Sequence, residues 1–436
     1  MIQVKLTRYY QTFKINWFMF LKRILIFSLI ILSCSIISQA QGKFSVNITE
    51  RMSGSPVCLN LDWFNYNTDK GDIALFELTQ EGELFTPSQL ETGISSRLWF
   101  IPGESEKRTG DRIFIIRLSD DSRNNSKKYA ITIERGHKDL KVTANNKPVL
   151  NYRFETTYPP EGIDPLYKRS GYIHPLWSPG GEQLTSIQPS DHYHHYGIWG
   201  PWTLTHIDGR ETDFWNLAKG EGTVKFGGFI SEVEGEVYSE FKVLQQHIDF
   251  GAAGEDQIAI NELLDVRIWN VSDNVRIIDY TTSFNTPLKN GIILDAYRYG
   301  GGIGFRATEK WHKDNCTVFT SENKNRSDAD GSLARWCIVE GESAGEEKRS
   351  GILFMSHPSN RMHPEPMRVW PVDANGGRGD IFFEFVPIRH NDWKLEKGCD
   401  YTLKYRLVVF DGLMDTKTAN NYWQDFAYMP KIKILE

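Results

Sequence analysis

The sequence predicts an all-β protein, with a small amino-terminal β-sandwich domain followed by a larger antiparallel β-sandwich. Apolar and polar residues alternate with a period of two along much of the chain, which is the pattern of strands with one buried face. Helical periodicity is scarce, and only one short helix is expected, from about Asp415 to Phe426. Turn-forming residues are dense and no fixed-period repeat is present, which favours an antiparallel sandwich.

Six alternating stretches are expected to form strands. The clearest is Tyr401–Val409, in which Leu403, Tyr405, Leu407 and Val409 would share one face. Leu140–Arg153 has the sequence Asn-Asn-Lys-Pro at its centre, which predicts a hairpin turn. The remaining four stretches are 112–118, 129–134, 275–284 and 380–387.

The chain divides into three parts by composition. Residues 1–40 are expected to be a signal peptide, residues 41–155 the small β-domain, and residues 156–436 the larger β-unit. Thr157–Arg169, which is rich in proline and charge, is expected to connect the two domains.

The amino terminus has the features of an export signal. Lys22 and Arg23 precede the apolar run Ile24–Ile37, and Ser38-Gln39-Ala40 offers small residues for cleavage. The run is shorter than the ~20 residues that span a bilayer, and no later stretch is long and apolar enough. The protein is therefore expected in the periplasm or secreted, or, alternatively, anchored as a surface or outer-membrane lipoprotein through Cys34.

Composition excludes some partners and leaves the redox state open. The chain has 436 residues, of which 40% are hydrophobic, and its net charge is −6. No segment is dense in Lys and Arg, so nucleic acid is not an expected partner. Export permits disulfides, and Cys316–Cys337 is the expected pair, with buried free thiols as the alternative.

The segment Asp191–Trp199 is the most chemistry-like part of the sequence. It contains His192, His194 and His195, three of the eleven histidines. Imidazoles are natural general acids and bases near neutral pH, so these three are candidate catalytic residues. In an extended chain His192 and His194 would point to one side and His195 to the other. A divalent metal held by His192 and His194 is one alternative, and a structural turn is another.

Two further stretches carry candidate site residues. In Tyr297–Arg306 the phenol of Tyr299 could transfer a proton and Arg306 could bind a carboxylate or sulfate. The glycines between them suit close approach of the backbone to a ligand. The loop His357–Pro366 contributes the candidate substrate-binding residues His357, Arg361 and His363.

Residues around the histidine segment complete the expected site. His174 lies upstream, and Trp199 and Trp215 offer flat faces that suit sugar rings. Asp213 could orient a histidine through its ring N–H. A glycosidase pair of carboxylates stays open, because several acidic residues are available: Asp191, Asp213, Glu262, Glu365 and Glu384.

These stretches resemble an exported bacterial family known as PmoA-like, or "methane oxygenase-like". The resemblance covers most of residues 170–412. Its most specific part is the histidine segment, although the family's pattern has Pro at Tyr193 and Arg at Tyr196. The supporting pieces are Tyr172–Pro175, Asp213–Trp215, Tyr299–Gly301, His357–Asn360 and Tyr405–Gly412.

The resemblance implies a galactose-mutarotase-like β-supersandwich that acts on carbohydrates with His, Arg and Tyr. It does not imply methane oxidation, because the membrane subunits with that activity span the bilayer repeatedly. Fold alone does not fix function.

The expected function is β-elimination on uronic-acid-containing oligosaccharides, as a lyase or a dehydratase. A cluster histidine would be the base, Tyr299 or a second histidine the acid, and Arg306 or Arg361 would hold the carboxylate. The alternatives are a mutarotase, epimerase or glycoside hydrolase on neutral sugars, and a non-catalytic glycan-binding protein. No cofactor is expected, apart from the possible metal.

Overall fold

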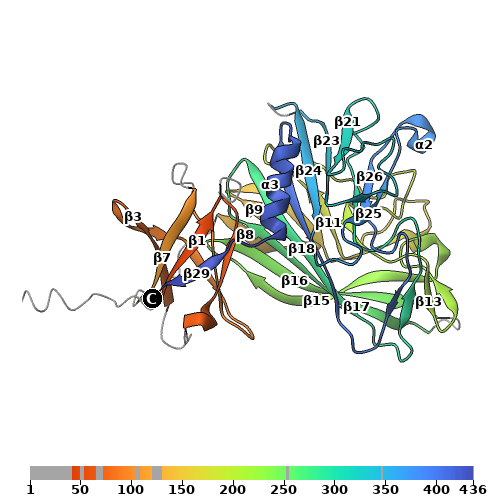
Figure 1. Cartoon of the computed structure of the whole chain (residues 1–436). Coiled ribbons are helices and arrows are strands. Elements are labelled where there is room, and N and C mark those ends of the chain that lie inside the picture. Colours follow the sequence, from red (N-terminus) through yellow and green to blue (C-terminus); the bar gives the residue numbers. More distant parts are fainter. Residues whose placement is uncertain are drawn as a thin grey trace, which may run out of the picture.

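The computed structural model describes residues 42–49, 54–64, 72–103, 109–119, 130–251, 255–344 and 347–435. The expected signal peptide, its cleavage site and Cys34 lie outside these residues. The prediction of an all-β protein is confirmed, since antiparallel sheets make up most of the described chain (Figure 1).

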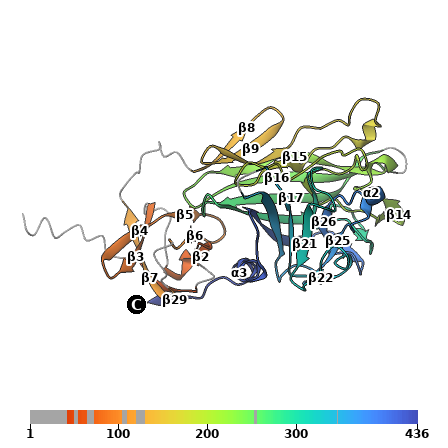
Figure 2. The same cartoon turned by 90° about the horizontal axis from the view of Figure 1, so that it is seen from above.

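The amino-terminal unit is a small sandwich of two sheets that stands to one side of the larger unit (Figures 1 and 2). Its apolar centre includes Phe44, Leu59, Phe100 and Phe114. One sheet has the order β29-β1-β7-β3-β4 and the other β2-β6-β5. The first contains β29 (Ile432–Leu435), β1 (Gly42–Ile48), β7 (Gly110–Ser119), β3 (Asp72–Thr79) and β4 (Gly82–Thr86), and the second contains β2 (Val57–Asn60), β6 (Arg97–Phe100) and β5 (Ser88–Glu91).

The larger unit is built on two long antiparallel sheets. The nine-stranded sheet runs in the order β22 (Leu333–Ala334), β25 (Glu365–Val369), β26 (Phe382–Phe385), β20 (Ile303–Arg306), β12 (Ile198–Trp199), β11 (Tyr172–Leu176), β10 (Lys147–Arg153), β9 (Asp139–Ala144) and β8 (Ile131–Arg135). The eight-stranded sheet runs in the order β15 (Gly222–Val233), β16 (Tyr238–Asp249), β17 (Gln257–Trp269), β18 (Val275–Asn285), β28 (Tyr401–Asp411), β24 (Arg349–Ser356), β23 (Trp336–Glu342) and β21 (Cys316–Thr320).

Side chains from both long sheets fill the space between them. On β28, Leu403, Tyr405, Leu407 and Val409 all belong to this core, as the alternation predicted. The predicted hairpin is present as β9 and β10, and Asn145 and Asn146 at its turn have positive φ, which the favoured two-residue hairpin turns require.

Smaller elements complete the larger unit. A four-stranded sheet consists of β14 (Arg210–Thr212), β13 (Thr205–Ile207), β19 (Ile292–Leu294) and β27 (Trp393–Leu395). Short helices are η2 (Leu61–Phe64) in the amino-terminal unit, and η4 (Pro165–Tyr167), η5 (Leu217–Lys219) and α2 (Ala374–Gly377) in the larger one.

The predicted carboxy-terminal helix is present as α3 (Thr416–Ala427). The side chain of Asp415 caps it by accepting a hydrogen bond from the backbone N–H of Thr418 at 2.7 Å. Ala419 and Trp423 bury the inner face of the helix against Trp336 and Met355. Among the described residues, no helix combines the length and apolar character needed to cross a bilayer.

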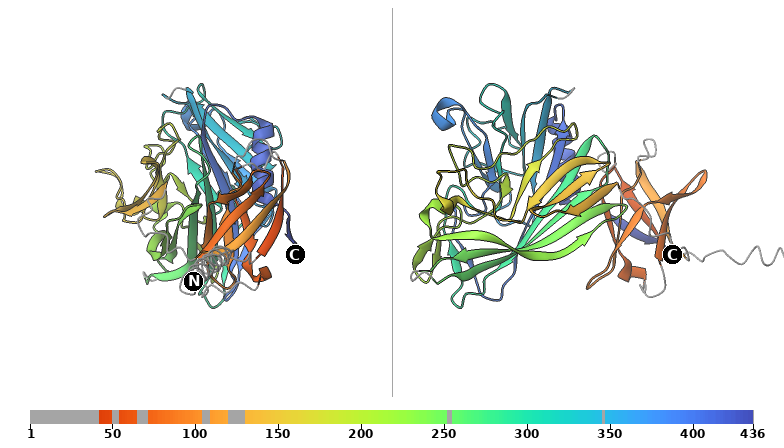
Figure 3. Two further views of the ribbon diagram at one scale, coloured as in Figure 1. Left: turned by 90° about the vertical axis from the view of Figure 1, so that its left-hand side faces the viewer. Right: turned by 180° about the vertical axis from the view of Figure 1, so that it is seen from behind.

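The boundary between the two units differs from the one drawn from the sequence. Strands β8 to β10, which fall within the predicted small domain, hydrogen-bond into the nine-stranded sheet, because Leu140, Val142 and Leu150 pack into the large core. The expected connector is a loop of the larger unit, closed by pairing of Thr157 with Arg169. After α3 the chain returns to the amino-terminal unit, where β29 pairs with β1 (Figure 3).

The expected Cys316–Cys337 disulfide is absent. Both cysteines are buried free thiols. Cys58, which is half-buried, and Cys399, which is exposed, are also unpaired. In the ladder between β21 and β23, Cys316 lies opposite Gly341 and Cys337 opposite Thr320. The two cysteines are therefore offset by four positions, roughly 13 Å along the strands, which is too far for a disulfide.

Candidate active site

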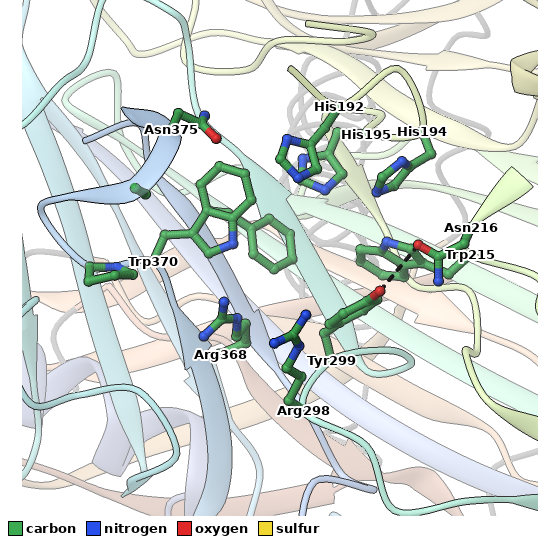
Figure 4. A pocket seen from close by; sticks show the side chains of 13 residues that line it. His192, His194, His195, Trp215, Asn216, Arg298, Tyr299, Arg368, Trp370 and Asn375 are labelled. Carbon is green, nitrogen blue, oxygen red and sulfur yellow. Dashed lines mark hydrogen bonds between the residues drawn. The ribbon is translucent and has the colours of Figure 1, made fainter. Parts of the chain in front are cut away.

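A pocket of about 420 Å³ opens where loops meet at β25, β26 and β20 of the nine-stranded sheet. Its lining is rich in imidazole, aromatic and guanidinium groups and, among the residues that the structure describes, contains no carboxylate (Figure 4). The lining residues are His192, His194, His195, Trp215, Asn216, Arg298, Tyr299, Arg368, Trp370, Pro371, Ala374, Asn375 and Phe382.

Local turns bring all three cluster histidines to the same pocket. The N–H of His192 donates to the carbonyl of Pro189 at 2.9 Å, and the N–H of His195 donates to the carbonyl of His192 at 3.0 Å. These turns replace the extended chain in which His195 would have faced the opposite side. Gly197 (φ +62°) then redirects the chain into β12, where a Cβ would collide with the carbonyl of Ile173.

The three rings contact one another. His192 and His195 are stacked, with centroids 4.7 Å apart and planes at 24°. His194 stands edge-on to both, at 5.3 Å from His192 and 4.8 Å from His195. Phe382 stacks on His195 at 5.0 Å, so the cluster has an aromatic floor.

Asp191 fixes the orientation of His192. Its carboxylate accepts a 2.7 Å hydrogen bond from Nδ1 of His192. Arg306 donates to the same carboxylate at 3.0 Å and Asn375 at 2.8 Å. Burial opposes ionisation of Asp191, but His192 and Arg306 outweigh it and hold the pKa of the carboxyl well below its usual range. Because Nδ1 carries the proton, Nε2 of His192 is left with a free lone pair.

Burial keeps the other two cluster histidines neutral. It lowers the pKa of His194 to about 4 and the pKa of His195 well below its ordinary value. The side chain of His195 is 3% exposed, and its buried Nδ1 has no hydrogen-bond partner among the described residues. Two neutral rings beside His192 avoid the repulsion that adjacent imidazolium ions would create.

The opposite wall holds a phenol on a rigid support. Tyr299 donates a 3.2 Å hydrogen bond to Oδ1 of Asn216, and burial raises the pKa of the phenol to about 12. Asn216 is in turn fixed by Asp213, which accepts from both its backbone N–H at 2.8 Å and its side chain at 2.7 Å. Trp215 packs against Tyr299 with centroids 5.5 Å apart.

Two guanidinium groups enter the pocket from the side of Tyr299, below Trp370 (Figure 4). Arg298 is exposed and forms no ion pair with a described residue, while its guanidinium lies 5.7 Å from the ring of Tyr299. Arg368, on β25, donates to Asp330 at 2.8 Å. The pocket therefore offers positive charge to a ligand without any lining carboxylate to cancel it directly.

Five of the eleven predicted site residues converge on the pocket: His192, His194, His195, Tyr299 and Trp215. Trp199 and Arg306 lie behind it. Trp199 packs on Trp215 at 4.9 Å. Arg306 is 1% exposed and forms an ion pair with Asp191. Arg306 therefore supports the histidine segment and does not line the space where a substrate carboxylate would bind.

The remaining four predicted residues lie away from the pocket lining. His174 is buried, with Nδ1 2.9 Å from the hydroxyl of Thr185. Arg361 is occupied by backbone carbonyls, including that of Pro387 at 2.6 Å. His357 and His363 pack against α3, on Phe426 and Trp423 respectively. The loop His357–Pro366 thus anchors the carboxy-terminal helix, and the prediction that it binds substrate is not supported by its position.

The candidate carboxylates are also committed elsewhere. Asp213 holds the Trp215–Asn216 turn rather than a histidine, and Glu262 pairs with the buried His247. Glu365 accepts hydrogen bonds from Ser356 and Tyr405, both at 2.7 Å. Glu384 accepts from the N–H of Gly300 at 2.9 Å. The histidine-orienting carboxylate is Asp191.

Sequence reasoning missed the pocket residues that it had no local reason to select: Asn216, Arg298, Arg368, Trp370 and Asn375. Arg298 lies inside a stretch that was singled out, next to Tyr299, and Asn216 directly follows Trp215. Both are in loops, where no periodic pattern distinguishes a pocket residue. Trp370 and Asn375 follow β25, and only the pairing of β25 with β26 places them beside the histidines.

The three imidazoles are also the group that could hold a divalent metal. One ring nitrogen of each lies within 4.8 Å of the others. A metal needs lone pairs that converge, and these lie in the ring planes. The planes of His192 and His195 are at 24° to each other, and the plane of His194 is at 72° to that of His192.

Stability is expected to fall in acid because of His194. An unfolded histidine titrates near pH 6.5, whereas folded His194 titrates near pH 4. Between these values only the unfolded chain takes up the proton, so the contribution is complete above pH 6.5 and is lost as the pH falls to 4. The difference is worth roughly 3 kcal/mol. Urea unfolding would be measured from pH 7.5 to 4. The free energy of unfolding should decline less steeply for His194→Gln than for the unchanged protein, and equal declines would contradict this assignment.

Comparisons with known proteins give a family and distant structural likenesses. The model of a family of unknown function, DUF6807, matches residues 139–424. That description names no activity and leaves the PmoA-like resemblance unconfirmed. No curated protein matches the sequence.

The solved structures that resemble this one include carbohydrate enzymes. Heparan sulfate lyase HepC from Pedobacter heparinus is 8% identical, with a TM-score of 0.30 over 65% of this chain and 35% of that chain, so this chain spans about a third of the lyase's length. A galactose mutarotase related enzyme from Lactobacillus acidophilus is 7% identical, with a TM-score of 0.32 over 65% of this chain and 99% of that one. A putative mutarotase, YeaD, from Salmonella typhimurium is 10% identical, with a TM-score of 0.30 over 65% and 94%. Likenesses this distant indicate no shared activity.

Proposed function

The chain belongs to DUF6807, a family of unknown function, and for it we propose β-elimination on uronic-acid-containing oligosaccharides, as a dehydratase or a lyase. One observation carries the proposal: three imidazoles, a protonated phenol and guanidinium groups line a single pocket, to which the described part of the chain contributes no carboxylate. These are the groups that removal of a proton next to a carboxylate requires. The amino-terminal sequence supports a place in the periplasm or outside the cell for this activity.

In the proposed reaction, Nε2 of His192 takes the C5 proton of the uronate. The electron pair of the C5–H bond forms the C4=C5 double bond. The C4–O bond breaks with its electron pair, and the departing oxygen takes the proton of the Tyr299 phenol. Water leaves in a dehydratase and a sugar in a lyase. The proton on His192 returns to Tyr299 through solvent, which restores both residues.

The arrangement around each residue fits its role. Asp191 accepts the Nδ1–H of His192 and would stabilise the imidazolium that forms when Nε2 takes a proton. Burial raises the pKa of Tyr299 to about 12, so the phenol is protonated at neutral pH and can donate that proton to the leaving oxygen. Trp215 and Trp370 line the pocket but are only 1% and 8% exposed, so they pack its walls and keep the reacting groups apart from solvent.

The direct test is alkene formation. The mature protein would be incubated with oligosaccharides that contain galacturonate, glucuronate, mannuronate or iduronate, and the ultraviolet absorbance of the conjugated product followed. Absorbance should rise with at least one of them, and mass spectrometry of the products would separate loss of water from cleavage. A flat trace with every uronate would overturn the proposal.

The same panel separates the alternatives. Turnover of neutral glycans without an alkene would indicate a mutarotase, epimerase or hydrolase, although the lining has no carboxylate pair for glycoside hydrolysis. Binding without turnover that survives alanine at His192, His194 and His195 would indicate a glycan-binding protein. A metal enzyme would contain stoichiometric metal as purified and lose activity with chelator.

Tyr299→Phe is expected to lower kcat for alkene formation about 100-fold, because the departing oxygen loses its proton donor. KM should change little, since the ring and its packing on Trp215 remain. Tyr158→Phe is the matched control, because Tyr158 is 65% exposed and does not line the pocket. Equal kcat values for the two variants would remove Tyr299 from the reaction.

A further inference from the structure

Two arginines that share one pocket are linked outside it through Asp330 and Arg389. Arg298 precedes β20 and Arg368 lies on β25, and both line the pocket on the same side (Figure 4). Asp330 accepts hydrogen bonds from Arg368 at 2.8 Å and from Arg389 at 2.9 Å. Arg389 in turn donates to the backbone carbonyl of Arg298 at 2.8 Å. Asp330 therefore fixes the side chain of Arg368 directly, and it reaches the backbone of Arg298 only through Arg389.

The segment that carries Arg298 is held from its other end as well. The N–H of Gly300 donates to the buried Glu384 at 2.9 Å, and Glu384 lies opposite Arg368 in the pairing of β25 with β26. Burial raises the pKa of Glu384 well above its ordinary value, and its hydrogen bond goes to a backbone N–H rather than to a guanidinium. The segment Arg298–Gly300 is thus tied to the same two strands as Arg368.

The charges in this group do not balance. Arg298, Arg368 and Arg389 are positive, and Asp330 is the negative group paired with them among the described residues. Two positive charges are left in excess. A uronate carboxylate brings one negative charge, whereas the same group brings two once the C5 proton has left and the electron pair spreads onto its oxygens. The excess matches the reacting state rather than the resting substrate.

We propose that Arg298 and Arg368 form a two-guanidinium clamp on the uronate carboxylate, positioned by Asp330, which binds this group most tightly when it gains its second negative charge. The inference rests on the proposed function. Groups placed in advance where charge develops are stabilising mainly in the transition state. The clamp is therefore expected to act chiefly on kcat.

Kinetics of single variants test the clamp with the uronate oligosaccharide that gives the fastest alkene formation. Arg298→Gln and Arg368→Gln should each lower kcat about 100-fold, with KM rising less than tenfold. Arg368→Lys keeps the positive charge but loses the paired N–H donors of the guanidinium. Its kcat should lie between those of Arg368→Gln and the unchanged protein. Arg335→Gln, which removes a guanidinium away from the pocket, should change neither constant. Unfolding curves for each variant would show that the fold is intact.

Asp330→Asn separates positioning from charge. This variant removes a negative charge, so a pocket that merely attracts anions would bind substrate more tightly and react at least as fast. The clamp predicts a kcat about tenfold lower, because Arg368 and Arg389 lose their common partner. Methyl esterification of the substrate should abolish turnover by every form of the protein.

The outcomes distinguish the two claims. No alkene from the unchanged protein with any uronate overturns the proposed function and the clamp with it. Alkene formation with Arg368→Gln within threefold of the unchanged kcat overturns the clamp and leaves the proposed function standing. An increase in kcat for Asp330→Asn overturns the positioning role of Asp330.

Discussion

Replacing His192 with alanine is expected to lower kcat for alkene formation about 1,000-fold. A positioned general base contributes roughly 10²–10⁴ in rate, and His192 is the cluster histidine whose Nδ1 is held by a carboxylate so that Nε2 is free to accept a proton. Steady-state absorbance assays would measure the change. Asp191→Asn should lower kcat by a smaller factor, about 10- to 100-fold, because the ring remains but the imidazolium loses its counter-charge.

His206→Ala provides the matched control for this experiment. His206 also pairs through Nδ1 with a carboxylate, that of Asp295, but it does not line the pocket. Its removal should leave kcat unchanged. If His192→Ala retained turnover within tenfold, the base would have to be His194 or His195, the other imidazoles of the lining.

Arg306→Met is expected to lower the free energy of unfolding by about 3 kcal/mol. Arg306 is 1% exposed and lies within ion-pair distance of both Asp191 and Asp380. Removing one partner of a buried ion pair typically costs several kcal/mol. The expected loss is at the lower end of that range, because Asp191 keeps His192 and Asn375, and Asp380 keeps Arg378. Urea unfolding at pH 7.5 would measure the loss.

The same variant decides what Arg306 does in the reaction. KM for a uronate should stay within threefold, because Arg306 does not line the pocket, and kcat should fall only through the loosened Asp191. Lys394→Gln, which breaks the exposed pair with Glu396, should change stability by less than about 1 kcal/mol. Unchanged stability together with a large increase in KM would restore Arg306 as a substrate-binding residue.

The fold could be predicted from the sequence wherever one strand face is buried. The alternation in Tyr401–Val409 and the Asn-Asn turn of the β9–β10 hairpin are local signals, and both elements are present. The domain boundary is not a local property. β8 to β10 belong to the larger unit because of hydrogen bonds to β11, and β29 joins β1 across nearly the whole chain, which no window of sequence reveals.

The site was predictable where chemistry is concentrated in a short stretch. Three histidines within four residues identified one wall of the pocket, and Tyr299 and Trp215 followed from neighbouring motifs. Residue type alone could not separate Arg306 from Arg298, because both are arginines of the same stretch. The difference arises from β20, which buries Arg306 behind Asp191 while Arg298 precedes the strand and stays exposed.

The ladder between β1 and β29 also constrains how the chain matures. Lys43 lies opposite Leu435 and Val46 opposite Ile432, so the first sheet to be synthesised lacks an edge strand until residues 432–435 have left the ribosome. An unpaired strand edge invites association with other chains. Nascent or truncated forms that end before Ile432 would therefore expose β1, whereas the larger sandwich closes on strands that are all made earlier.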